Sequence, residues 1–278
     1  MKKIVLTGAA GALGASLRAA LSKRADALVS TDIAEVADLL PNETFVQADL
    51  ADYAAMAAII DGADMVVHFG ALVDEAPFDD ILGPNIIGAY NVWEAAWRTG
   101  ARRVVYASSI HAVGMYEKTE FVGVDDPHRP DGFYGLAKCF SEDLARMYWE
   151  KRGLEAVCLR ILSCTPEPTN SRAIGSWLSH DDMLHLVDRA ITTPVVGFTI
   201  AYGVSANDRS PVDNAAAAVL GYRPKDNAED WAEAILAASS PADPTDLSHN
   251  RHGGPFAAVK MGESGIAQIK AMSVKTGG

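Results

Sequence analysis

Three glycines between a predicted strand and a predicted helix are the feature that most constrains how this chain folds. The apolar residues 4–6 predict a short β-strand, and Gly8, Gly11 and Gly14 follow at three-residue spacing before helix-forming residues begin. Glycine allows backbone angles and close approaches that a Cβ forbids, so a pyrophosphate can lie against bare amides at a helix N-terminus. We therefore expect a phosphate-binding turn at the start of an α/β fold.

The residues after this turn indicate that its phosphate ligand is a dinucleotide. A second predicted strand, residues 27–32, ends on Asp32, eighteen residues after Gly14. An acid at this point accepts hydrogen bonds from an adenosine ribose and repels a 2′-phosphate, which favours NAD over NADP. The alternatives are a solvated Asp32 and a merely structural turn, and the combined pattern favours the NAD site.

The rest of the chain alternates predicted strands and helices. This alternation is typical of the α/β class, with a Rossmann doubly wound parallel sheet and helices on both faces. Further strands are expected at residues 44–49, 64–71, 103–109, 155–162 and 195–200, and helices at 11–23, 52–60, 84–99, 133–152 and 227–238. We divide the chain into a NAD-binding Rossmann core, residues 1–165, and a small C-terminal substrate-binding region with a tail, residues 166–278. The two parts are expected to interleave as one compact unit.

Residues at the carboxyl ends of the strands face the crevice in such a sheet. Asp49 and Leu50 are expected beside an adenine, although an Asp at a strand end is also typical of a helix cap. Gly70 and Ala71 have small side chains that leave room for a ribose and a pyrophosphate. His68 lies inside an apolar run, where we expect a hydrogen-bonded core histidine.

Tyr134 and Lys138 are the strongest catalytic candidates. They are four residues apart in the helix expected at 133–152, so they lie on one helix face. An ammonium near a phenol favours the phenolate and lowers its pKa from about 10, which gives a base usable near neutral pH. The alternative is an ordinary amphipathic helix with one exposed lysine. Ser109, at the end of the fifth strand, is expected to face the same crevice.

Residues 8–14, 107–109 and 134–138 together resemble the extended short-chain dehydrogenase/reductase superfamily, which also contains nucleotide-sugar epimerases and dehydratases. The resemblance implies that Tyr134 is the base, that Lys138 orients the ribose and lowers the tyrosine pKa, and that Ser109 hydrogen bonds the reacting oxygen. The expected cofactor-binding residues are Gly8, Gly11, Ala12, Leu13, Gly14, Asp32, Ile33, Asp49, Leu50, Phe69, Gly70, Ala71, Tyr134, Lys138, Ile161 and Cys164.

Residues 163–182 resemble the uronate dehydrogenase family, as do shorter matches elsewhere up to about residue 256. That family oxidises the anomeric carbon of a hexuronic acid with NAD and gives an aldarolactone. The resemblance implies that Arg172 binds the sugar carboxylate, as its planar fork suits, and that His111 donates to a ring hydroxyl. The expected substrate-binding residues are Val73, Ser109, Ile110, His111, Tyr134, Ser163 and Arg172.

Two positions depart from the family pattern. Val73 and Ile110 stand where a serine and an asparagine usually hydrogen bond sugar hydroxyls. Valine and isoleucine cannot make these bonds, so a different sugar acid or an aldose is a second possible substrate. An epimerase or dehydratase that retains its NAD, and a redox-sensing regulator that binds NAD without catalysis, are also compatible with a dinucleotide-binding fold. The small C-terminal region favours a free sugar over a nucleotide sugar.

Charge and hydropathy narrow the expected partners. The formal net charge is −12 and the pI is about 5.0, which argues against a nucleic-acid partner. No apolar run approaches the roughly eighteen residues of a membrane span, and Met1 leads directly into a strand. We therefore expect a cytoplasmic enzyme, a homo-oligomer, that acts on a small-molecule sugar acid without contact with a membrane.

Cysteine and histidine usage gives no metal-site pattern. Cys139, Cys158 and Cys164 lack metal-type spacing and are expected to be reduced core residues. His180 is followed by two aspartates, but a helix start with Ser179 as its cap explains this cluster better than a metal site.

Overall fold

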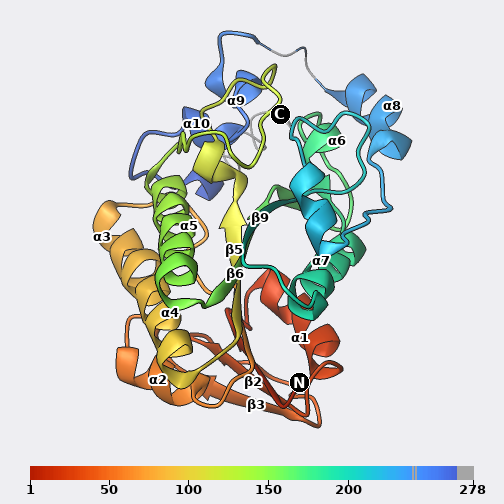
Figure 1. Ribbon diagram of the computed structural model, residues 1–278. Helices are drawn as coiled ribbons and strands as arrows, with labels where there is room; N and C mark the ends of the chain where they lie inside the picture. Colours follow the sequence, from red (N-terminus) through yellow and green to blue (C-terminus); the bar gives the residue numbers. More distant parts are fainter. Residues whose placement is uncertain (240, 242, 268–278) are drawn as a thin grey trace.

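The computed structural model describes residues 1–239, 241 and 243–267, which form a parallel sheet with helices on both faces (Figure 1). In the described chain, seven strands pair in the order β3-β2-β1-β4-β5-β6-β9, and every pair is parallel. The strands are β1 (Lys3–Thr7), β2 (Ala27–Asp32), β3 (Glu43–Gln47), β4 (Met65–His68), β5 (Arg103–Ser109), β6 (Glu155–Ile161) and β9 (Phe198–Gly203). This is the predicted Rossmann arrangement, with its switch point between β1 and β4.

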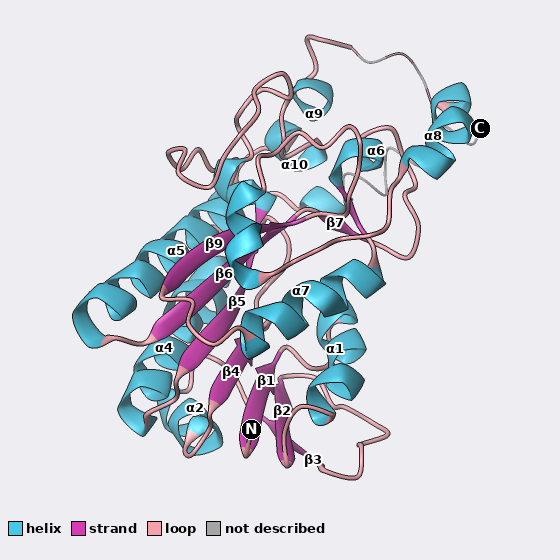
Figure 2. Ribbon diagram, turned by 45° about the vertical axis from the view of Figure 1, so that its right-hand side comes forward, coloured by secondary structure: helices cyan, strands magenta, loops and turns pink. Residues whose placement is uncertain are grey.

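The two faces of the sheet have separate apolar cores, because successive side chains of a strand point to opposite faces. Ile4 and Leu6 pack with helices α1 and α7, whereas Val5 packs with helices α2, α4 and α5. Figure 2 shows the same two helical layers around the sheet. These helices are α1 (Ala12–Ser22), α2 (Tyr53–Ile60), α4 (Gly88–Thr99), α5 (Phe133–Arg152) and α7 (His180–Thr192).

Short elements cover the carboxyl ends of the strands, in the upper part of Figure 2. Most of them come from the second half of the chain and are joined by irregular loops. They are η2 (Ile110–Val113), β7 (Ser163–Cys164), α6 (Ala173–Ser176), β8 (Trp177–Leu178), η3 (Ala215–Leu220), α8 (Glu229–Ala238), α9 (Leu247–Asn250) and α10 (Pro255–Ala258). None of the helices in the described residues is both long enough and apolar enough to cross a membrane.

The helix expected at residues 84–99 does not begin where the sequence predicts. It continues from α3 (Phe78–Ile81) through the π-helical segment η1 (Leu82–Ile87) into α4. Asn85 is therefore inside a helical stretch and does not cap its start. Its buried amide instead accepts from Leu72 N (2.8 Å) and donates to Leu72 O (2.9 Å). Pro84 suggests a helix start, but a π turn tolerates its missing N–H.

Other boundaries follow local signals closely. Helix α5 has the predicted bounds and ends at Gly153, whose φ of 70° is left-handed. Strand β9 begins at Phe198, three residues later than predicted, because Gly197 (φ 57°) turns the chain just before it. Ser179 caps α7 as predicted, since its side chain accepts from Asp182 N (3.0 Å).

A buried ion pair joins the sheet to α5. Arg160 of β6 donates to both carboxylate oxygens of Glu142, at 3.0 and 2.9 Å, and the Ser108 hydroxyl donates to the same carboxylate. Burial opposes the charge of Glu142, but hydrogen bonds from His128 and Arg160 hold its pKa below the usual value. The pair therefore fixes α5 against β5 and β6 through a fully hydrogen-bonded carboxylate.

Removing this carboxylate charge is expected to destabilise the protein strongly. Glu142→Gln leaves the buried guanidinium of Arg160 without its counter-charge, which costs about 3–5 kcal/mol in comparable buried pairs. Urea denaturation measures the loss. The matched control is Glu229→Gln, which breaks the exposed pair with Arg209 and is expected to change stability little. Equal losses of stability in the two variants would show that the buried pair contributes no more than the exposed pair.

Candidate active site

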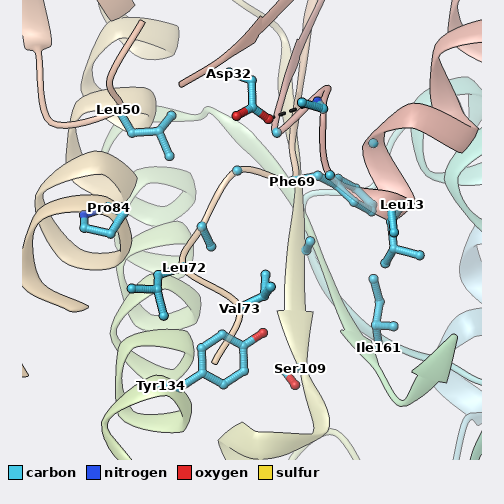
Figure 3. Close-up of a pocket in the computed structure, with 18 of the residues that line it drawn as sticks. Leu13, Asp32, Leu50, Phe69, Leu72, Val73, Pro84, Ser109, Tyr134 and Ile161 are labelled. Atoms are coloured by element: carbon cyan, nitrogen blue, oxygen red, sulfur yellow. Dashed lines mark hydrogen bonds between the residues drawn. The ribbon is translucent and has the colours of Figure 1, made fainter. Parts of the chain in front are cut away.

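A cavity of about 890 Å³ lies at the carboxyl ends of the central strands (Figure 3). Its walls come from the ends of the six strands β1 to β6 and the segments that follow them, together with Tyr134 and Lys138 of α5 and Phe256 of α10. Ligand and cofactor sites commonly have volumes of about 300–1,000 Å³. The cavity is therefore at the predicted crevice and has the size of a cofactor site.

The glycine turn brings β1, α1 and the loop after β4 close together. Gly8 has a φ of 75°, and a Cβ on it would lie 2.5 Å from Gly70 N. A Cβ on Gly14 would lie 1.9 Å from Gly8 O, so α1 reaches this position only without a side chain. Helix α1 has Gly11 as its N-cap and no side chain that caps its amides. These free amides face the cavity wall and suit a pyrophosphate.

The acids at the ends of β2 and β3 both lie in the cavity wall. Asp32 accepts a hydrogen bond from Ala10 N (3.0 Å), which couples the end of β2 to the glycine turn (Figure 3). The cap of α2 is Asp52, which accepts from Ala55 N, so Asp49 is not that cap. Asp49 instead lines the cavity, and its place beside an adenine stays a prediction.

Every residue predicted to bind the cofactor lines this one cavity, although the residues come from six separate segments of the chain. Their fit to NAD rests on the uncapped helix, the glycine turn and the acid at the end of β2. The full set is Gly8, Gly11, Ala12, Leu13, Gly14, Asp32, Ile33, Asp49, Leu50, Phe69, Gly70, Ala71, Tyr134, Lys138, Ile161 and Cys164. His68, in contrast, is a buried core residue whose Nδ1 lies 2.7 Å from Thr7 Oγ1, as predicted.

Ser109, Tyr134 and Lys138 meet at one end of the cavity. Tyr134 lies in the first turn of α5, and Figure 3 shows its phenol beside the Ser109 side chain. Lys138 Nζ lies 5.2 Å from the centroid of the Tyr134 ring and donates to Ala107 O at 2.7 Å. The tertiary structure thus assembles the three residues that the sequence indicates as a group.

Burial has the largest effect on the pKa values of Tyr134 and Lys138. It raises the pKa of Tyr134 to about 12, although the Ser109 hydrogen bond lowers it, and the charge of Asp131 raises it further. Burial also lowers the pKa of Lys138 to about 7. The pKa of Tyr134 thus lies above its ordinary value in the chain alone, because burial disfavours the phenolate. The prediction that Lys138 lowers the tyrosine pKa stays a prediction.

His111 is held by an acid and an aromatic ring. Its Nδ1 lies 2.6 Å from Asp131 Oδ2, and its ring stacks on Phe256 with centroids 4.4 Å apart. A carboxylate accepts hydrogen bonds, so Nδ1 carries the proton and Nε2 of the neutral ring is an acceptor. The expected donation by His111 to a sugar hydroxyl thus requires the protonated ring. Phe256 belongs to the tail, for which the sequence pattern indicates no role.

Glu75 is a functional residue that sequence reasoning missed. The N-cap of α5 is Gly132, which has no side chain, and the buried carboxylate of Glu75 accepts from Phe133 N (3.0 Å) and Tyr134 N (2.9 Å). It also accepts from Gly262 N at 3.0 Å. These partners are 58, 59 and 187 residues away along the chain, so no local pattern indicates the role. Glu75 therefore caps the helix that carries Tyr134 and ties the C-terminal segment to it.

Three predicted substrate residues do not line the main cavity: Ile110, Ser163 and Arg172. Arg172 Nη1 donates to Ser163 Oγ (2.7 Å), and its Nε and Nη2 donate to His252 O. Ile110 is buried in an apolar cluster with Val113 and its neighbours. Ile110 and Arg172 line a second, smaller cavity instead. Ile110 does not line the main cavity, because the turn η2 directs it into this apolar cluster, and its contact with a substrate stays a prediction.

Val73 lies where the sequence predicts. It lines the main cavity, and its side chain points toward the phenol of Tyr134 in Figure 3. It is 60% exposed, so the apolar group faces the space in which a substrate would lie. The thiol of Cys164 also lines the cavity, whereas Cys139 and Cys158 are buried and unpaired.

Comparisons with known proteins agree with this geometry. Residues 4–189 match the model of the NAD dependent epimerase/dehydratase family. The chain is 46% identical to a uronate dehydrogenase of Agrobacterium fabrum over 92% of this chain and 97% of that protein. It superposes on a uronate dehydrogenase variant of Agrobacterium tumefaciens complexed with NAD, with a TM-score of 0.90, 45% identity and coverage of 94% and 98%. A glucuronic acid dehydrogenase of Chromohalobacter salexigens gives a TM-score of 0.90 at 40% identity, covering 93% and 97%.

The raised pKa of Tyr134 gives a direct spectroscopic prediction. A group whose pKa rises from 10 to about 12 stays protonated up to pH 10, where an ordinary tyrosine is half ionised. The difference in tyrosinate absorbance between the wild type and Tyr134→Phe is therefore expected to be close to zero at pH 10. A difference equal to half a tyrosinate would contradict the dominance of burial. Tyr53→Phe, which removes an exposed phenol, is the matched control for the loss of one tyrosine.

Proposed function

Since the chain belongs to the NAD-dependent epimerase/dehydratase family, and within it to the uronate dehydrogenases, we propose that it oxidises a hexuronic acid at C1 with NAD to give an aldarolactone. The observation that carries this proposal is the meeting of Ser109, Tyr134 and Lys138 at one end of a cavity whose other end has the glycine turn and Asp32. One site thus joins a dinucleotide cradle to a proton acceptor.

The chain's own residues account for the proton and for the orientation of the sugar. Tyr134 accepts the proton of the C1 hydroxyl, and Ser109 hydrogen bonds the same oxygen. Lys138, held by Ala107 O, places its amine beside the phenol and the expected ribose. Bound NAD supplies the acceptor for the hydride that leaves C1 and a positive charge that favours the phenolate. This positive charge would offset the destabilisation of the phenolate that burial of Tyr134 causes in the chain alone.

The acid group of the sugar is assigned to Arg172. Its guanidinium is fixed by Ser163, whose neighbours Leu162 and Cys164 line the main cavity. Three of its five N–H groups are used by protein acceptors, so two stay available to a carboxylate. The support for this role is its position in the segment after β6 and the uronate specificity of the related enzymes.

Val73 bears on which sugar acid is preferred. A valine in the cavity wall offers no hydrogen bond to a sugar hydroxyl, and an unpaired hydroxyl costs binding free energy of about 1–3 kcal/mol. A differently configured sugar acid, or an aldose, is the second candidate substrate. An epimerase or dehydratase that retains NAD is the third candidate, and it uses the same tyrosine without net NADH.

The remaining expectations are part of the proposal. The core of residues 1–165 would bind NAD, and residues 166–278 would complete the substrate site, although residues 268–278 lie outside the described chain. The expected homo-oligomer and the cytoplasmic location stay predictions.

Incubation with NAD and a panel of sugars tests the proposed reaction. Galacturonate or glucuronate is expected to give steady NADH formation, whereas neutral aldoses give much less because they offer no carboxylate to Arg172. The product is followed as a lactone by NMR. Turnover of a sugar without net NADH would replace the proposal by the epimerase alternative, and no turnover of any acid would reject it.

Loss of the Glu75 carboxylate is expected to slow turnover without weakening NAD binding. Glu75→Ala frees the amides of Phe133 and Tyr134, so the first turn of α5 can shift the phenol. Misplacement by about 1 Å lowers kcat by up to about a hundredfold, and we expect a fall of at least about tenfold. Glu75→Gln retains an acceptor oxygen and is expected to restore part of kcat.

Asp79→Asn, on the nearby helix α3, is the matched control and is expected to leave kcat unchanged. The dissociation constant of NAD, measured by calorimetry, separates a positioning role from general damage. Equal losses of NAD affinity and kcat in Glu75→Ala would contradict the positioning role.

A further inference from the structure

Asp131 is a buried acid behind the wall of the main cavity, and the proposed reaction leaves it without a role. It belongs to the irregular segment before α5, and its side chain is 1% exposed. Its carboxylate lies against the imidazole of His111, with 2.6 Å between Oδ2 and Nδ1. His111 lines the main cavity, whereas Asp131 does not. Asp131 can therefore affect a ligand in the cavity through His111 without touching that ligand.

Two glycines leave the space that the Asp131 carboxylate occupies. Gly114 follows the turn η2, and Gly253 precedes α10, so the two come from opposite halves of the chain. A Cβ on either glycine would overlap Oδ2 of Asp131. Gly253 N also donates to Gly114 O at 2.9 Å, which holds the two segments together beside the acid. The packing therefore encloses this carboxylate closely and leaves it little room to move.

The imidazole of His111 is held from further directions. One face stacks on Phe256, with ring centroids 4.4 Å apart and an interplanar angle of 29°. The Tyr134 ring meets it edge to face, with centroids 5.6 Å apart. The backbone N–H of His111 donates to Ser109 Oγ at 3.3 Å. In the described residues, no hydrogen bond uses the second ring nitrogen, Nε2, so this atom stays available to a group in the cavity.

A carboxylate at Nδ1 determines which tautomer of a neutral imidazole is present. Because a carboxylate only accepts hydrogen bonds, the proton lies on Nδ1 and Nε2 keeps its lone pair. The neutral ring is the ordinary form of a histidine above pH 7. A sugar hydroxyl can donate to such a lone pair, whereas a ring with its proton on Nε2 needs an acceptor instead. Without the carboxylate both tautomers are accessible, and the hydroxyl would meet a mixture of the two.

We propose that Asp131 is a positioning residue that holds His111 in the tautomer with a bare Nε2, which accepts a hydrogen bond from a hydroxyl of the bound sugar. This inference deepens the proposed function and rests on it, because the partner of Nε2 is a group of that substrate. The hydrogen bond has the opposite direction to the donation by His111 that the family resemblance implies. Asp131 itself touches neither the sugar nor the cofactor.

The charge of Asp131 allows this role to be separated from a purely electrostatic one. The charge raises the pKa of Tyr134, which opposes the phenolate of the proposed base. Removing the charge therefore favours the phenolate. A loss of activity in a variant without the carboxylate thus cannot come from the effect of the charge on Tyr134.

A double-mutant cycle of Asp131→Ala and His111→Gln tests the role. In the wild-type background, Asp131→Ala is expected to lower kcat/KM for galacturonate or glucuronate about tenfold, the value of about one hydrogen bond. The change is expected mainly in KM, because the bond forms in the ground state as well as in the transition state. In the His111→Gln background, Asp131→Ala is expected to change kcat/KM by less than about twofold.

Equal losses of kcat/KM in the two backgrounds would overturn the proposal, because Asp131 would then act on the fold and not through His111. An unchanged kcat/KM of Asp131→Ala in the wild-type background would also overturn it. Asp125→Ala, which removes an exposed aspartate of the same loop, is the matched control and is expected to leave kcat/KM unchanged.

The tautomer is measured directly in the wild type, so the test does not depend on the folding of Asp131→Ala. A long-range proton–nitrogen correlation spectrum of the isotope-labelled full chain distinguishes a bare ring nitrogen from a protonated one, and His111→Gln identifies the signal. With the ring neutral, we expect the proton on Nδ1 and a bare Nε2. A proton on Nε2 would overturn the proposal. If no hexuronic acid is oxidised, the proposed function fails, and this spectrum still supports or overturns the role of Asp131 by the same criterion.

Discussion

The close contact between the glycine turn and the loop after β4 is the constraint on which the rest of the structure depends. Gly8 lies against Phe69 and Gly70, and Gly14 lies against Gly8, at distances that leave no room for a Cβ. This contact places the N-terminus of α1 at the switch point between β1 and β4, where the sheet opens into a crevice. A larger residue at either position would separate α1 from the sheet and close the cofactor cradle.

Two buried acids hold the helix that carries Tyr134 at the catalytic end of the cavity. Glu142 fixes the middle of α5 to β5 and β6, and Glu75 holds its first turn. Tyr134 lies between these two attachments, so its phenol has a fixed position relative to Ser109. Both carboxylates are fully hydrogen bonded, which is the condition under which a buried charge contributes order without a large penalty. The buried contacts of α5 thus fix the position of Tyr134, whose side chain lines the cavity.

Burial also sets the electrostatic balance between the two cavities. In the main cavity it opposes the phenolate of Tyr134 and the ammonium of Lys138, so the proposed chemistry needs a further positive charge. In the second cavity it lowers the pKa values of Lys118 and Arg172. Arg172 lines the second cavity, and the charge of Asp131, which is held by His111, raises its pKa against the effect of burial.

The sequence by itself determined the elements and much of the cofactor site. Periodicity and glycine positions are local signals, so α5, β2 and β5 have their predicted bounds, and all sixteen predicted cofactor residues line one cavity. The tertiary structure decided what depends on distant partners. Glu75 caps a helix 58 residues away, Phe256 returns to cover His111, and Ile110 turns into an apolar cluster instead of the cavity. It also decided the pKa of Tyr134, because spacing places an ammonium near a phenol but only packing determines how much water both of them lose.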